Sequence, residues 1–179
     1  MNETTTTIPQ MPPTGHAGFA YALSGVDWAQ VQAELRGLDV LAQLPQRRRL
    51  SKDFHWYSPV LSEYLADCVA DLVVRVGTED DVRQVAQVAA RHKLPLAVRA
   101  GGTGHYGQCV PPNRGNGLDV GAVARILDIQ PGRVRAQAGA RMYDIEMAAR
   151  ETGQGLRMWP STWHVASIGG FISRGVGGV

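Results

Sequence analysis

Two glycine-rich stretches, separated by about sixty residues, contain the residue types and spacings in this chain that are most typical of a functional site. Residues 99–108 read Arg-Ala-Gly-Gly-Thr-Gly-His-Tyr-Gly-Gln, and residues 160–170 read Pro-Ser-Thr-Trp-His-Val-Ala-Ser-Ile-Gly-Gly. Each stretch follows an apolar run and replaces side chains with bare backbone. Glycine gives the backbone the freedom to turn several N–H groups toward one anion. Together the two stretches predict a phosphate-binding site.

The first stretch also matches the dinucleotide-binding pattern G-x-G-x-x-G over residues 102–107. That pattern requires a helix after the last glycine, with its N-terminus facing the pyrophosphate. Pro111 and Pro112 follow too closely for such a helix, and the loop comes after the second strand of its unit rather than the first. The sequence therefore disfavours an NAD-dependent dehydrogenase and favours a nest of backbone N–H groups, to which Thr103 adds a hydroxyl.

The elements around the first stretch follow from hydrophobic periodicity. Residues 72–76 and 94–100 predict strands, and residues 78–81 predict the capped, acidic start of a helix that ends near His92. This order is a βαβ unit, whose two strands should be parallel with a right-handed crossover.

Further short strands are predicted downstream at residues 118–120, 125–129 and 133–138, with a hairpin-like turn at Pro131 and Gly132. A helix is predicted over residues 141–152, ended by Gly153.

The residues before the βαβ unit predict a lead-in and a tail. Residues 21–65 form a helical and aromatic lead-in, in which Asp27 caps a helix and Pro45 ends an apolar segment. The aromatic-rich residues 51–65, His55 and Tyr57 among them, are expected to pack irregularly against the main domain. Residues 1–20 are rich in Thr and Pro and predict a disordered tail.

Composition excludes several classes of protein. A formal charge of +2 is too small to indicate a nucleic-acid-binding protein, and the basic run at residues 47–49 is typical of a solvated helix end. Cys68 and Cys109 fit neither a disulfide framework nor a metal site. No apolar run approaches the ~20 residues that span a bilayer. The N-terminus lacks a secretory pattern, so we expect a cytoplasmic protein without nucleic-acid, membrane or metal partners.

Several short blocks then occur in one order along the chain. They are Arg-x-Gly-Gly-Thr from residue 99, Gly-Gln at 107–108, Leu-Asp-Val at 118–120, Arg-Ile-Leu at 125–127, Ala-Gly-Ala at 138–140, Pro-Ser-Thr at 160–162 and Ile-Gly-Gly at 168–170. Residues 66–179 thereby resemble the FAD-binding PCMH-type domain of the vanillyl-alcohol oxidase/p-cresol methylhydroxylase type oxidoreductases.

The resemblance implies an α+β fold, with an FAD-binding domain of two α+β subdomains. A small parallel βαβ unit would occupy residues 66–110, and a larger antiparallel sheet with helices would begin near residue 117. Because a glycine-rich segment is a poor domain terminus, we expect a truncated chain that holds only the N-terminal part of this domain.

The resemblance also assigns the cofactor site. Residues 100–106 are similar to the pyrophosphate-binding loop of the family, and residues 168–170 to a turn where the backbone approaches the diphosphate and flavin. The candidate FAD-binding residues are Ala100, Gly101, Gly102, Thr103, Gly104, His105, Tyr106, Gln108, Pro160, Ser161, Thr162, Ile168, Gly169 and Gly170.

The chain departs from the family at one informative position. Many relatives carry, directly after the second loop glycine, a histidine that links FAD covalently, and this chain has Thr103 there. The resemblance therefore implies non-covalent FAD, with His105 as a polar loop residue. Arg99 is open to a role as loop anchor or as phosphate ligand. Trp163 and His164 fit a core or surface role at least as well as contact with the flavin.

For the complete enzyme the resemblance implies hydride transfer from a small organic substrate to the flavin. No catalytic acid or base can be assigned, and this part alone is expected to be inactive. A missing C-terminal portion or a second copy of the chain are the expected protein partners. The alternative is a truncated, non-catalytic nucleotide-binding or interaction module.

Overall fold

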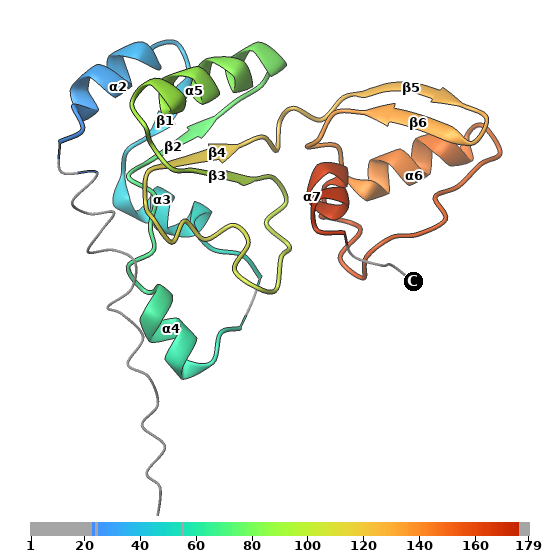
Figure 1. The fold of residues 1–179 in the computed structure, drawn as a ribbon. Coiled ribbons are helices and arrows are strands. Elements are labelled where there is room, and N and C mark those ends of the chain that lie inside the picture. Colours follow the sequence, from blue (N-terminus) through green and yellow to red (C-terminus); the bar gives the residue numbers. More distant parts are fainter. Residues whose placement is uncertain (1–22, 24, 55, 176–179) are drawn as a thin grey trace, which may run out of the picture.

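The computed structural model describes residues 23, 25–54 and 56–175, so the predicted tail and His55 lie outside the described residues. The chain forms one four-stranded sheet and one two-stranded sheet, each accompanied by helices (Figure 1). In chain order the elements are α2 (Trp28–Glu34), β1 (Asp39–Leu41), α3 (Leu44–Leu50), α4 (Pro59–Leu65), β2 (Leu72–Arg75), α5 (Glu79–Arg91), β3 (Leu96–Arg99), β4 (Asn116–Asp119), β5 (Ile126–Gln130), β6 (Arg133–Ala136), α6 (Met142–Arg150) and α7 (Ile168–Ser173).

The larger sheet has the strand order β1-β2-β4-β3. Strands β2 and β3 are joined through α5 and run parallel, as predicted, but each pairs with β4, which lies between them. The expectation that the second sheet begins near residue 117 is therefore wrong, because β4 belongs to the first sheet, in which β2, β4 and β3 run parallel and β1 pairs with β2 antiparallel. Leu118 on β4 is buried, and a central strand between two parallel neighbours gains this burial.

Helices α2 and α5 cover one face of this sheet, as Figure 1 shows. Val31 and Leu35 from the α2 region, and Val85 from α5, share a buried cluster with Val74 of β2. Val73 points the other way and packs with Leu41 and the α3 residue Leu50. This alternation along β2 is the period of two that a strand with both faces covered requires.

Helix α5 begins where the sequence predicts. The Thr78 hydroxyl accepts a hydrogen bond from the Asp81 N–H at 3.1 Å, and the Asp81 carboxylate accepts from the Thr78 N–H at 2.9 Å. This capping box fixes the start of the crossover helix.

The lead-in contains more regular structure than expected. Pro45 stands in the first turn of α3 rather than ending a segment, and α4 follows Ser58, whose hydroxyl accepts from the Leu61 N–H. Proline is favoured in the first turn of a helix because its missing N–H has no partner there. The side chains of Phe54 and Trp56 are exposed, so the prediction of irregular packing over residues 51–65 is wrong for α4 and for these two aromatics.

The second sheet is the predicted hairpin, with β5 and β6 antiparallel and Gly132 in its turn at a φ of +73°. Helix α6 follows and packs beside the hairpin (Figure 1). Helix α7 was expected as a turn. It forms because the Ser167 hydroxyl accepts a hydrogen bond from the Gly170 N–H at 3.3 Å and caps the helix.

A buried carboxylate on α6 holds the segment that leads into the second glycine-rich stretch. Glu146 accepts hydrogen bonds from the Leu156 N–H and from Arg150 Nε, both at 2.7 Å. These two donors, first the Leu156 N–H and then the Arg150 guanidinium, hold the pKa of the Glu146 carboxyl below its ordinary value. The ionised form therefore stabilises the folded chain.

The substitution Glu146→Gln is expected to lower the free energy of unfolding near neutral pH by about 1 kcal/mol. A depressed carboxyl pKa contributes stability above the ordinary value of about 4.3, and this stability is lost as pH falls through the folded-state pKa. Urea unfolding at neutral and acid pH should show the difference from wild type closing in acid. Glu151→Gln, at the exposed end of the same helix, is the control. A difference that does not depend on pH would contradict this role.

Candidate functional site

A cavity of about 630 Å³ lies where the carboxyl end of β3 meets the chain around residues 160–174. Both glycine-rich stretches contribute to its wall. The lining residues are Val98, Arg99, Ala100, Gly101, Gly102, Thr103, Gly104, Gln108, Cys109, Val120, Ala138, Pro160, Thr162, Ala166, Ser167, Gly169, Gly170, Phe171, Ser173 and Arg174.

The loop that begins the first stretch is held from outside by the segment after α3. The Asp53 carboxylate accepts hydrogen bonds from the Gly107 N–H at 2.8 Å and from the Tyr57 hydroxyl at 2.7 Å. The Phe54 N–H donates to the Gly104 carbonyl at 3.1 Å. Burial, followed by the hydrogen bond to Asp53, raises the pKa of the Tyr57 hydroxyl above its ordinary value, so this phenol stays a donor.

The N–H groups of residues 100–105 donate no hydrogen bond to any part of the chain that the structure describes. Residues 100–104 all line the cavity. Backbone donors in folded proteins are nearly always paired with protein or water. A run of unpaired donors beside a cavity is the arrangement that an anion site requires.

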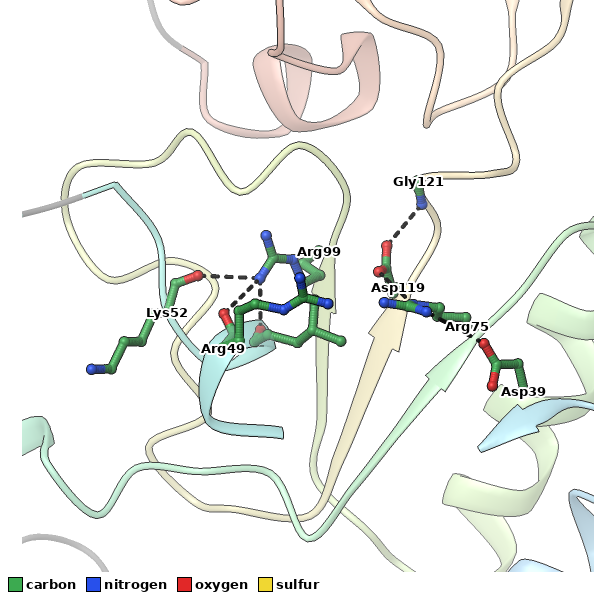
Figure 2. Close-up of polar contacts among 8 residues, drawn as sticks. Asp39, Arg49, Lys52, Arg75, Arg99, Asp119 and Gly121 are labelled. Carbon is green, nitrogen blue, oxygen red and sulfur yellow. Dashed lines mark hydrogen bonds and ion pairs between the residues drawn. The ribbon is translucent and has the colours of Figure 1, made fainter. Parts of the chain in front are cut away.

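Arg99 anchors the base of this loop (Figure 2). Its Nη1 atom donates to the carbonyl oxygens of Leu50 at 2.9 Å, Lys52 at 3.2 Å and Arg49 at 3.5 Å. The sequence left open whether Arg99 anchors the loop or binds phosphate. These bonds show that its Nη1 atom anchors the loop, while its Nε atom is buried without an acceptor among the described residues. Gly102 has a φ of +64°, and a Cβ there would overlap the Arg99 guanidinium, so this position requires glycine.

Asp119, the last residue of β4, has a carboxylate that already has partners within the chain. Asp119 accepts a hydrogen bond from the Gly121 N–H at 3.0 Å and lies 3.8 Å from Arg75, which reaches Asp39 at 3.6 Å (Figure 2). Asp119 is not among the lining residues.

In the second glycine-rich stretch, unlike residues 100–105 of the first, backbone N–H groups donate hydrogen bonds within the chain. The N–H groups of Ile168 and Gly169 donate to the carbonyls of Ala140 and Ala138 at 2.8 and 2.9 Å, and the Gly170 N–H donates to Ser167. A Cβ on Gly169 would come within 2.7 Å of the Ala138 Cβ. The glycine here permits close packing of backbone on backbone, and the donors of these three residues are already paired.

Most of the predicted site residues meet at the cavity, but four do not line it: His105, Tyr106, Ser161 and Ile168. His105 is exposed. Trp163 and His164 lie against Tyr143 of α6, with ring centroids 5.3 and 5.0 Å from the tyrosine ring, and neither lines the cavity.

Sequence reasoning missed several lining residues with functional groups, namely Cys109, Ser167, Ser173 and Arg174. Arg174 could have been noticed as a cation within a glycine-rich segment. Burial raises the pKa of the Cys109 thiol, which therefore stays protonated. No group of three His, Cys, Asp or Glu side chains that could hold a metal ion occurs within the described ranges. No helix in the same ranges is long and apolar enough to cross a membrane.

Comparison with known proteins identifies the class of domain. A family model described as FAD binding domain matches residues 70–179, which is more than half of the chain, so the chain belongs to this family. The glycolate oxidase subunit GlcD of Escherichia coli (strain K12) is 33% identical over 110 residues, which cover 60% of this chain and 22% of that protein. The chain thus spans about a fifth of the length of this curated relative.

Solved structures share the fold. One structure of p-cresol methylhydroxylase with substrate bound aligns with a TM-score of 0.69 at 20% identity, over 86% of this chain and 31% of that one. The 4-ethylphenol oxidase from Gulosibacter chungangensis aligns with a TM-score of 0.65 at 19% identity, over 80% and 28%. These findings confirm a PCMH-type FAD-binding domain with an α+β fold, and FAD as its cofactor.

The contact between the two stretches is tight enough to test. A Cβ on Gly101 would overlap the Val165 carbonyl oxygen, whereas a Cβ on Gly77 would meet nothing closer than 3.9 Å. Gly101→Ala is expected to lower the free energy of unfolding by about 1–3 kcal/mol, because backbone atoms must move. Gly77→Ala is the control and should change it by less than about 0.5 kcal/mol. Equal unfolding midpoints in urea for the two variants would contradict this contact.

Proposed function

We propose that this chain is the diphosphate-binding part of an FAD-dependent oxidoreductase, and that the loop over residues 100–104 holds the diphosphate. The observation that carries the proposal is the run of unpaired N–H groups beside the cavity. Since the family binds FAD, an anion with two phosphate groups is available to accept them. Thr103 and Thr162, one from each glycine-rich stretch, add hydroxyl donors to the lining.

The remaining lining fits the rest of such a ligand. Val98, Val120 and Phe171 give the cavity an apolar portion, as is typical of cofactor pockets. Thr103 cannot form the flavin bond for which relatives use histidine, and His105 lies outside the lining. We therefore propose that FAD is bound non-covalently.

When bound, FAD supplies a hydride acceptor for a small organic substrate. The residues described here bind and orient the cofactor. No proton transfer is assigned to them, because the Cys109 thiol is protonated and the Asp53 carboxylate is occupied by Gly107 and Tyr57. Glycolate oxidase, as the named relative, supports a small substrate. A cytoplasmic location stays a prediction from the sequence.

The test is a visible absorption spectrum of the chain after incubation with FAD and removal of free ligand, repeated on the supernatant after acid precipitation. We expect bound flavin, and its release by acid. Gly102→Val should abolish retention, because its φ of +64° and the neighbouring Arg99 guanidinium both exclude a side chain. Gly77→Val, at an exposed position, is the matched control.

Two results would contradict the proposal. One is wild-type chain that remains colourless at saturating FAD. The other is a Gly102→Val variant that is folded by circular dichroism and retains as much flavin as the control.

A further inference from the structure

Arg174, the residue that ends α7, lies at the cavity beside the first glycine-rich stretch. Its side chain lines the cavity, and its guanidinium carbon lies 5.7 Å from the centroid of the Tyr106 ring. Tyr106 is 80% exposed. A cation over an exposed ring gains only a weak attraction, so this contact positions the guanidinium without satisfying its donors.

Two arginines line the cavity, and their bonding differs. Arg99 donates from Nη1 to three backbone carbonyls and so anchors the chain, while its Nε, like that of Arg174, is buried without an acceptor among the described residues. Within the described parts of the chain, Arg174 makes no hydrogen bond and no ion pair, and its Nε atom is buried without an acceptor. A buried donor without a partner is costly, and native structures rarely leave one unless a ligand, ion or water completes it.

No carboxylate of the described residues accepts a hydrogen bond from the Arg174 guanidinium. Among the described residues no carboxylate forms an ion pair with Arg174, and the two that influence the Cys109 thiol in the cavity wall together with Arg99 and Arg174, namely Asp53 and Asp119, have other partners. Asp53 is bonded to Gly107 and Tyr57, and Asp119 is bonded to Gly121 and lies near Arg75. The cavity therefore has a cation and a row of N–H donors, and neither set has a partner among the described residues.

We propose that Arg174 is a diphosphate-binding residue that pairs with the phosphate oxygens of FAD together with the N–H groups of residues 100–104. The inference rests on the proposed function and adds to it the positive charge that the ligand requires. A guanidinium suits this role because its planar fork of donors matches phosphate oxygens two at a time.

The experiment is a fluorescence titration of the chain with FAD and with riboflavin, which lacks the diphosphate, at low and high salt. Arg174→Gln should weaken FAD binding by about 10- to 100-fold, the usual effect of removing a charge-assisted hydrogen bond, and leave riboflavin binding unchanged. It should also flatten the salt dependence of FAD binding, because screening acts on the charge pair. Arg133→Gln, an exposed residue of the hairpin, makes the same change in net charge and is the control.

Each outcome is decisive. Unchanged FAD affinity in Arg174→Gln, or equal weakening of FAD and riboflavin, would overturn the inference. Wild-type chain that binds neither ligand would overturn the proposed function instead. If the glutamine variant fails to fold, the same titration is made with Arg174→Lys, which keeps the positive charge but lacks the planar set of guanidinium donors. It should bind FAD about three- to tenfold more weakly, and wild-type affinity would contradict the inference.

Discussion

The cavity exists because three pairs of backbone segments approach more closely than any side chain would permit. Gly101 meets the Val165 carbonyl, Gly169 meets Ala138, and Gly139 meets the carbonyls of the β4–β5 connection. The Gly101 and Gly139 contacts join the four-stranded sheet side of the cavity to the part of the chain that contains the hairpin, α6 and α7, and the Gly169 contact lies within that part. Since a Cβ at these positions would force backbone atoms apart, the walls of the site depend on the absence of side chains.

The two glycine-rich stretches have similar compositions and different physical roles. In the first, the conformational freedom of glycine leaves a run of N–H donors unpaired beside the cavity. In the second, the donors of residues 168–170 are paired within the chain, and the glycines serve packing. The two arginines of the cavity differ in a similar way. Arg99 donates from Nη1 to backbone carbonyls, whereas Arg174 makes no hydrogen bond among the described residues, and the Nε of each is buried without an acceptor. Of the two glycine-rich stretches, the first therefore offers donors to a ligand and the second holds the fold. Of the two arginines, Arg174 is the one available to a ligand, and Arg99 anchors the chain.

The sequence predicts those parts of this fold whose signals are local. The crossover helix follows from the Thr78–Asp81 capping box, and the hairpin follows from the turn at Gly132, because both signals act within a few residues. The place of β4 between β2 and β3 depends on pairing across the sheet, which no local pattern encodes. Likewise Arg174 was missed, because its importance comes from the partners that Asp53 and Asp119 find elsewhere.

The most direct test of the account follows the backbone N–H groups themselves, by titrating the ¹⁵N-labelled chain with ADP and recording amide chemical shifts. ADP carries the diphosphate without the flavin. The account predicts the largest shift changes at residues 100–104, with much smaller changes at residues 168–170, whose donors are already bonded. Changes concentrated at residues 168–170, or spread over the hairpin while residues 100–104 stay fixed, would contradict it.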